Sequence, residues 1–295
     1  MKNYRFLLLM ILISSFFSAQ RTLLAKVDSI AGKDATIAVS VKGMDFPFEF
    51  NNENSERHLP MQSVFKFHIA CTVLNFVDRG KLSLNQKIFV SKKDFLPDTW
   101  SPIREKYPQG NVRLKLSEIL YYTVAMSDNN GCDILLRLIG GTDTVQKFMD
   151  TKGIHHFQIR YNEEQMHSGW DFQFENYTTS DSLAEVLDQF YQGKLLSAAS
   201  TKWLMNILLK TTTGTNKLKA GLPANTPIAH KTGASGRKDG IAAAENDMGI
   251  ITLPDGRHYA IAVLVSNSPM PDDANCAVIE KISRAVWNFL NKQYL

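Results

Sequence analysis

Ser63 and Lys66 stand three residues apart at the start of a long apolar run, residues 60–77. On a helix this spacing puts both side chains on one face, about one turn apart. The free N–H groups at a helix start favour a developing negative charge, and a lysine in an apolar wall loses solvation of its charged form. These residue types at this spacing therefore predict a serine nucleophile with a lysine as its base.

The apolar run itself predicts a buried helix. Pro60 suits a first helical turn, and no breaker interrupts the residues that follow. A second serine-x-x-lysine occurs at Ser235 and Lys238. Chance alone gives about one such match in a chain of this size and average composition. The spacing is therefore not specific by itself, and what distinguishes Ser63 is that it opens a long apolar helix.

Ser127-Asp128-Asn129 follows another apolar helical stretch. Serine and aspartate are common helix caps, so one interpretation is a cap for the next helix. The other is functional, with a second hydroxyl that relays a proton and an amide that fixes a substrate carbonyl. The tripeptide alone does not decide between them.

Lys231-Thr232-Gly233 ends a strand-like segment that Ala234 and Ser235 continue. A lysine and a hydroxyl on an edge strand can bind a substrate carboxylate, and the Ala234 N–H can face an oxyanion. The alternative is an ordinary strand end that runs into a glycine turn.

The remaining pattern predicts an α+β fold. Strand-like segments lie near both ends of the chain, at 35–41, 46–50, 228–232, 247–253 and 258–266. Helical patterns occur at 21–31, 116–123, 131–139, 142–152, 179–192, 200–209 and 275–294. The simplest packing is one antiparallel sheet flanked by helices, with an inserted all-helical lobe. We expect an α/β domain from residues 20–57 and 212–295, a helical domain from 58–211, and the site in the cleft between them.

The N-terminus predicts a secretory signal peptide. Lys2 and Arg5 accompany an apolar stretch at 6–17, and small residues around Ala19 favour cleavage after it. The stretch is too short to span a bilayer, and no cysteine follows it for lipid anchoring. We expect residues 1–19 to be removed, leaving a soluble exported protein without a membrane anchor, periplasmic in a Gram-negative source.

Composition argues against several other classes. A net charge of +4, with no basic stripe interleaved with aromatics, does not indicate nucleic-acid binding. Cys71 and Cys132 lie in apolar helical runs, where buried free thiols are favoured over a disulfide, and Cys276 is left over. No paired cysteines or His-Glu-x-x-His motif indicates zinc, and we expect no cofactor.

Together the three short motifs are far more specific than each alone. They occur in order on a helix start, in an interhelical loop and on a strand, a set that marks class A β-lactamases and penicillin-binding proteins. Over essentially its whole mature length the chain resembles a class A serine β-lactamase, and most closely the extended-spectrum PER-like and VEB-like subgroup. The closer resemblance rests on residues 96–102, 131–136, 162–167 and 211–214.

The resemblance implies a role for each motif residue. Ser63 would attack the β-lactam carbonyl, Lys66 would assist its deprotonation, and Ser127 would protonate the leaving ring nitrogen. The implied substrate-binding residues are Asn129 at the acylamide side chain, Lys231 and Thr232 at the ring carboxylate, Ala234 at the oxyanion with the Ser63 N–H, and Gly233, Ser235 and Trp100.

Glu163 would distinguish an enzyme that hydrolyses its acyl-enzyme from a protein that stays acylated. It lies in residues 158–178, which lack periodicity, and a long irregular loop in a compact protein is usually functional. A carboxylate folded over Ser63 can activate the water that frees the acyl-enzyme. Glu164 is the adjacent alternative, and the resemblance favours Glu163. Whether Lys66 or Glu163 is the acylation base stays open.

The chain also departs from the commonest class A pattern. Met166 and His167 replace leucine and asparagine, and Asp133 replaces asparagine, so we expect an altered loop and a wider cleft. His167 either helps to place the hydrolytic water or packs the loop. No arginine near Asp239 matches the one that many members aim at the substrate carboxylate, and Lys217 is the expected substitute.

The sequence therefore predicts a secreted, monomeric hydrolase of penicillins and cephalosporins, oxyimino-cephalosporins included. One alternative is a penicillin-binding D,D-peptidase, which uses the same motifs without needing Glu163. The other is a β-lactam sensor module that does not hydrolyse its ligand.

Overall fold

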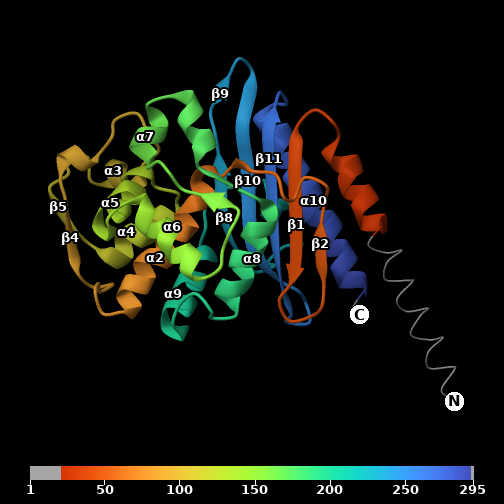
Figure 1. The fold of residues 1–295 in the computed structure, drawn as a ribbon, viewed down its shortest axis with the longest axis horizontal. Helices are drawn as coiled ribbons and strands as arrows, with labels where there is room; N and C mark the ends of the chain where they lie inside the picture. Colours follow the sequence, from red (N-terminus) through yellow and green to blue (C-terminus); the bar gives the residue numbers. More distant parts are fainter. Residues whose placement is uncertain (1–20, 294–295) are drawn as a thin grey trace.

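The computed structural model describes residues 21–293. A six-stranded antiparallel sheet lies at the centre of the larger lobe, in the order β2-β1-β11-β10-β8 with β9 on β10 (Figure 1). The strands are β1 (Thr36–Gly43), β2 (Glu49–Asn51), β8 (Ile228–Ala234), β9 (Arg237–Lys238), β10 (Ile241–Thr252) and β11 (His258–Ser268). Because β1 pairs with β11 along its whole length, the two ends of the chain share one sheet, as predicted.

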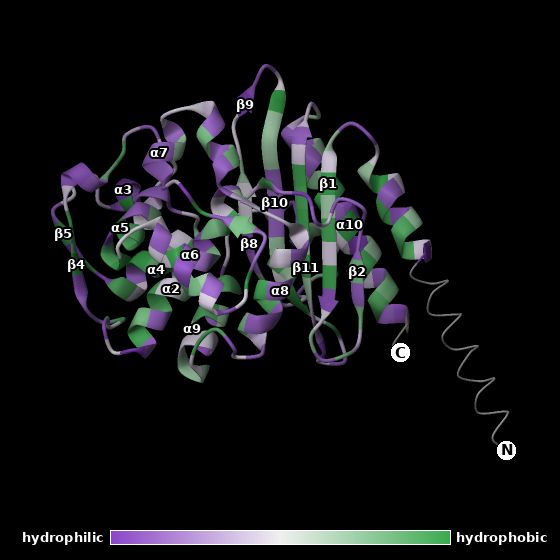
Figure 2. Ribbon diagram, in the orientation of Figure 1, coloured by the Kyte–Doolittle hydropathy of each residue, from purple (hydrophilic) through white to green (hydrophobic). Residues whose placement is uncertain are grey.

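Helices cover both faces of this sheet. On one face, Val39 and Val263 share a core with the helix at residues 21–31 and with α10 (Asp272–Gln293). On the other face, Ala38 and Leu264 belong to the core of the helical lobe, and α8 (Ser180–Tyr191) packs against β1 and β11. β10 and β11 are therefore buried on both sides, and Figure 2 shows hydrophobic residues along both strands.

The second lobe is mainly helical. Its helices are α2 (Lys66–Asp78), α3 (Pro102–Lys106), α4 (Leu116–Ala125), α5 (Asn129–Ile139), α6 (Thr142–Thr151), α7 (Glu163–His167) and α9 (Ala198–Leu208). Short strands pair locally: β3 (Leu59–Pro60) and β6 (Phe157–Gln158) with β7 (Tyr177–Thr178), and β4 (Lys87–Val90) with β5 (Val112–Lys115). The 3₁₀ turns cover Gln62–Phe65, Lys92–Asp94, Trp170–Glu175 and Leu218–Gly221.

The buried helix after Ser63 is confirmed, since residues 66–74 of α2 are all buried. Its predicted start at Pro60 is wrong. Pro60 pairs with Tyr177 in β3, and Gln62 has a φ of 48°, which a right-handed helix does not allow. Ser63 therefore sits in a 3₁₀ turn that leads into α2.

Two other local predictions differ from the structure. β10 begins at Ile241 rather than at residue 247, because the alanines near its start carry no β-branched signal. Residues 158–178 hold α7, a 3₁₀ turn and two short strands, so this segment is more regular than expected. The predicted signal peptide lies outside the described residues, and within residues 21–293 no helix has the length and apolar character to cross a bilayer.

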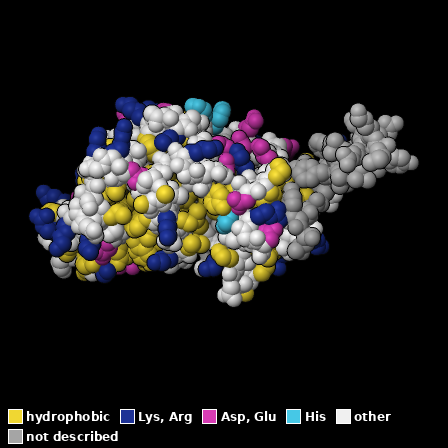
Figure 3. Space-filling model, turned by 90° about the horizontal axis from the view of Figure 1, so that it is seen from below, with side chains coloured by type: hydrophobic (Ala, Val, Ile, Leu, Met, Phe, Trp, Pro, Cys, Tyr) yellow, Lys and Arg dark blue, Asp and Glu magenta, His cyan; other side chains and the backbone are white. Residues whose placement is uncertain are grey.

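One face of the molecule carries mixed charge. On the face seen in Figure 3, lysine and arginine side chains are scattered among acidic and hydrophobic ones rather than gathered in a stripe.

Candidate active site

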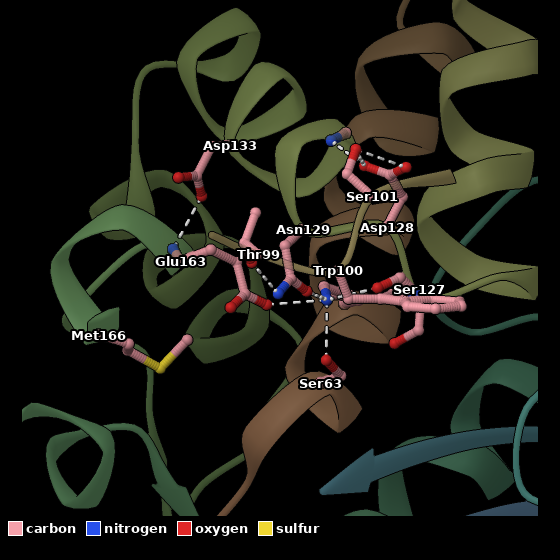
Figure 4. Close-up of polar contacts among 12 residues, drawn as sticks. Ser63, Thr99, Trp100, Ser101, Ser127, Asp128, Asn129, Asp133, Glu163 and Met166 are labelled. Atoms are coloured by element: carbon pink, nitrogen blue, oxygen red, sulfur yellow. Dashed lines mark hydrogen bonds and ion pairs between the residues drawn. The ribbon is translucent and has the colours of Figure 1, made fainter. Parts of the chain in front are cut away.

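Lys66 is the centre of the polar cluster at the cleft. It is the first residue of α2 and 0% exposed, and its Nζ lies 2.7 Å from the Oγ of Ser63. The same ammonium donates to the Ser127 carbonyl oxygen at 3.0 Å and to the side-chain oxygen of Asn129. The structure thus brings the first two motifs together around one nitrogen, with Ser63, Asn129 and Glu163 converging on it in Figure 4.

The backbone is strained at two positions near Lys66, at Gln62 before Ser63 and at Ser127. Gln62 and Ser127 have φ values of 48° and 59°, and the other non-glycine residues with positive φ in the described chain are Asn, Asp or His, which tolerate it best. Such conformations cost about 1–3 kcal/mol and persist where the surroundings enforce them. The Gln62 amide donates to Gln173 at 2.6 Å, a contact that helps to hold the turn carrying Ser63.

Asp128 confirms the cap interpretation of the second motif. It is 0% exposed and caps α5. The Asp128 carboxylate accepts hydrogen bonds from the Gly131 N–H at 2.7 Å, the Ile103 N–H at 2.6 Å and the Ser101 hydroxyl at 3.0 Å. The cap anchors the tripeptide while its neighbours Ser127 and Asn129 line the cleft, so the two interpretations are compatible.

Lys231 joins the third motif to the second. It is 0% exposed, and its Nζ donates to Ser127 Oγ at 2.8 Å and to the Thr232 carbonyl oxygen at 2.8 Å. Burial, followed by the nearby Lys66 cation, lowers the pKa of Lys231 well below its usual value. The Thr232 hydroxyl lies 2.6 Å from that of Thr213 at the cleft wall.

Gly233 lets the edge of β8 approach the nucleophile. A Cβ at this position would lie 2.8 Å from the Met61 carbonyl oxygen and 3.1 Å from the Ser63 nitrogen. Ala234 follows, exposed at the cleft. Ser235 also borders the cleft, but its hydroxyl accepts from the Ala244 N–H at 3.0 Å and so pins the strand end.

Glu163 lies against Lys66, whereas Glu164 does not. Glu163 Oε1 is 2.8 Å from Lys66 Nζ, and its side chain is 5% exposed. Glu164 is exposed and lines a different hollow, which Ser63 does not border. The N–H groups of both residues donate to the Asp133 carboxylate, at 2.8 and 2.9 Å, which fixes the start of α7. Burial raises the pKa of Asp133 to about 6, and these two N–H groups oppose the rise.

His167 contacts the backbone of Glu163. Its Nδ1 is 2.8 Å from the Glu163 carbonyl oxygen, and because a carbonyl only accepts, Nδ1 carries the hydrogen. Nε2 lies 3.3 Å from the Thr99 hydroxyl, which in turn accepts from the Asn129 amide at 2.6 Å. Thr99 thus links α7 to the second motif. Thr99 lies in the segment 96–102 that carries the resemblance, but no role is predicted for it, because a loop threonine gives no signal of such a contact.

Two hollows meet at the candidate nucleophile. One of about 410 Å³ extends toward Glu163 and His167, and one of about 390 Å³ extends toward the third motif. Ser63, Asn129 and Ala234 border both. Trp100 stands at the rim of the second hollow, 55% exposed, with its indole N–H donating to a backbone oxygen at 2.8 Å.

Lys217 lines the second hollow, but its ammonium is occupied. It is 5% exposed, forms an ion pair with Glu245, and donates to the carbonyl oxygens of Gly233 at 3.2 Å and Asn246 at 3.1 Å. An ammonium has three N–H donors, and all three have partners within the protein. A bond from Lys217 to a substrate carboxylate would have to displace one of these partners, so that role stays a prediction.

The cysteines form no disulfide. Cys71, Cys132 and Cys276 are free and buried, which confirms the preference for free thiols. Among residues 21–293, no group of three or more His, Cys, Asp or Glu side chains is placed to hold a metal ion.

Comparison with known proteins supplies independent evidence. Residues 22–290 match the model of the Beta-lactamase enzyme family. The chain is 44% identical to the β-lactamase VEB-1 of Pseudomonas aeruginosa, covering 97% of this chain and 98% of that protein. It is 42% identical to the extended-spectrum β-lactamase PER-1 of the same organism, covering 96% and 92%. The crystal structure of the TLA-1 extended-spectrum β-lactamase superposes with a TM-score of 0.90 at 45% identity, covering 92% of this chain and 99% of that one.

Proposed function

The chain belongs to the class A serine β-lactamase family, and from that premise we propose that it opens penicillins and cephalosporins through an acyl-enzyme on Ser63. The observation that carries the proposal is the unbroken series of contacts from Ser63 Oγ to Lys66 Nζ, at 2.7 Å, and on to Glu163 Oε1, at 2.8 Å. It supplies a nucleophile that borders the cleft, and behind it a buried base and a buried proton acceptor.

The same line can serve acylation. The Lys66 ammonium first passes a proton to the Glu163 carboxylate, 2.8 Å away, and the neutral amine that remains accepts the Ser63 proton during attack on the ring carbonyl. The two candidate bases then act in sequence. The negative charge that develops on the carbonyl oxygen would be held by the N–H groups of Ser63 and Ala234, each worth about 3 kcal/mol of barrier.

Ring opening requires a proton on the departing nitrogen. The Ser127 hydroxyl is the candidate donor, and Lys231, 2.8 Å away, would replace its proton. Because burial and the Lys66 cation lower the pKa of Lys231, its ammonium is a stronger acid than an exposed lysine. Lys231 and Thr232 remain the candidate groups for the substrate carboxylate.

Deacylation assigns Glu163 its second role. Its carboxylate borders the larger hollow next to Ser63, where a water could lie between the two side chains. Asp133 and His167 hold the backbone of Glu163 at N–H and carbonyl respectively, at 2.8 Å each, so α7 is positioned from both sides. We assign His167 to this positioning rather than to direct contact with water.

The relatives support a substrate range, and the N-terminal pattern supports a location. Resemblance to PER-1 and TLA-1, both described as extended-spectrum enzymes, supports oxyimino-cephalosporins as substrates. The N-terminal pattern supports export to the periplasm after cleavage behind Ala19. We propose that the mature protein is a monomer with a helical domain at 58–211 and an α/β domain at 20–57 and 212–295.

The test is turnover of an oxyimino-cephalosporin by purified mature protein, followed by loss of ring absorbance. The proposal expects many turnovers per molecule at a steady rate. A single stoichiometric burst would indicate a sensor, and release of D-alanine from a D-Ala-D-Ala peptide without cephalosporin turnover would indicate a peptidase.

A further inference from the structure

Lys217 has a buried ammonium with no role in the mechanism above. Both partners of its ion pair with Glu245 are nearly inaccessible, with side-chain exposures of 6% and 7%. Burying two charges is costly, so such a pair is kept where its geometry serves another purpose or its hydrogen bonds compensate. The remaining donors of Lys217 go to two backbone oxygens, those of Gly233 and Asn246.

The Gly233 carbonyl is one half of a peptide unit whose other half is the Ala234 N–H. The described residues contain no cis peptide bonds, so this unit is trans and its carbonyl and N–H point in opposite directions. Anchoring the oxygen on the Lys217 side therefore fixes the direction of the Ala234 N–H on the other side. That N–H is the candidate second donor to the oxyanion.

The packing leaves the peptide unit few alternatives. Gly233 lies against the Ser63 backbone, since a Cβ added to it would lie 3.1 Å from the Ser63 nitrogen. Gly214 lets the chain pack against the Lys217 side chain, since a Cβ there would meet Thr232 at 2.4 Å and Lys217 at 3.2 Å. A positive charge at the carbonyl oxygen also polarises the amide and strengthens its N–H as a donor.

We propose that Lys217, anchored by Glu245, is a positioning residue of the oxyanion hole: its ammonium holds the Gly233 carbonyl and so aims and polarises the Ala234 N–H. Glu245 has a second effect, because it keeps the cation on the wall of the cleft and away from the substrate carboxylate. This inference rests on the proposed function, since it needs an acyl transfer at Ser63.

The first variant is Lys217→Met combined with Glu245→Gln, which removes both charges together and leaves no unpaired ion buried. The matched control is Lys219→Met, an exposed lysine in the same segment. Lys217→Arg, which keeps a cation with several donors, is the conservative variant. Thermal unfolding of each protein establishes that it is folded.

The substrates are a chromogenic cephalosporin and its ring-carboxylate methyl ester. Stopped flow at saturating substrate concentration measures the acylation rate separately from binding. Removing an oxyanion donor costs about 10²–10³-fold, so a misaimed donor is expected to slow acylation by about tenfold or more. The loss should be equal for acid and ester, absent in the Lys219 control and largely restored in Lys217→Arg.

A vibrational measurement gives a readout that a merely structural role would not move. In a Glu163→Gln background the acyl-enzyme carbonyl stretch should shift to higher frequency when the Lys217 and Glu245 changes are added, because the carbonyl is less polarised. A loss confined to the free acid, with weaker binding, would assign Lys217 to the carboxylate and overturn the proposal. Unchanged acylation and an unchanged stretch would also overturn it. Absence of cephalosporin turnover in the unmodified chain would instead defeat the proposed function.

Discussion

The carboxylate of Glu163 lies 2.8 Å from the ammonium of Lys66, and both side chains are buried. The two residues come from different elements, α7 and α2, that are far apart in the chain. The two opposite charges compensate each other. The Ser63 hydroxyl also lies within hydrogen-bond distance of the Lys66 Nζ. The position of α7 therefore decides whether the nucleophile has one neighbouring base or two.

Gly233→Ala should impair catalysis more than stability. The added methyl would meet the Met61 carbonyl oxygen at 2.8 Å and push the β8 edge away from Ser63. A displacement of this kind is expected to lower kcat/KM by about 10²-fold. Steady-state kinetics with a chromogenic cephalosporin measures it, and Gly236→Ala is the control, since nothing lies within 4 Å of its Cβ position. Equal kinetics for the two variants would contradict the close packing of β8 on Ser63.

Asp133→Asn should change how stability depends on pH. The folded-state pKa of Asp133 is raised to about 6 from 3.8, so the folded protein binds the extra proton between these values. The contribution of Asp133 to stability is therefore present at low pH and is lost as pH rises through about 6. Urea unfolding at several mildly acidic pH values measures this. As pH rises, the free energy of unfolding should fall more steeply for the native chain than for Asp133→Asn. Parallel curves would contradict the burial assigned to this carboxyl.

Asp128→Ala should destabilise the protein. It strands two buried backbone N–H groups and the Ser101 hydroxyl, and each unpaired group costs about 1–3 kcal/mol. Urea unfolding should show a loss of at least about 2 kcal/mol. Asp128→Asn, which keeps one acceptor oxygen, should lose less, and the exposed Asp98→Ala should lose little. A fully stable Asp128→Ala protein would show that the cap is dispensable.

Much of the fold could be predicted from the spacing of residues along the chain. The sheet, most helices and the Ser63–Lys66 contact were predictable because each depends on local periodicity or on residues one turn apart. Pro60 was misassigned because the positive φ of Gln62 starts a new turn, and that conformation is held by Gln173 from a distant segment. Nothing in the residues around Pro60 signals such a contact.

Long-range polar contacts account for the rest. Lys217 is expected at the substrate carboxylate because the chain lacks the arginine near Asp239 that many class A members aim at that group. Its buried partner, Glu245, lies on β10, and the pairing depends on a strand start that the alanine run concealed. The linking role of Thr99 was not predicted for a similar reason, since its contacts with Asn129 and His167 exist only once α5 and α7 are in place.

The most direct measurement is mass spectrometry of Glu163→Gln during reaction with a cephalosporin, alongside steady-state turnover. We expect Ser63 to carry a persistent adduct of substrate mass and turnover to fall by at least about 10²-fold, because a general base contributes that much. The matched variant Glu164→Gln, exposed and outside the cleft, should clear its adduct and retain turnover. Steady turnover without an adduct in Glu163→Gln would show that another group readies the water, and would contradict the assignment of Glu163 as the base for deacylation.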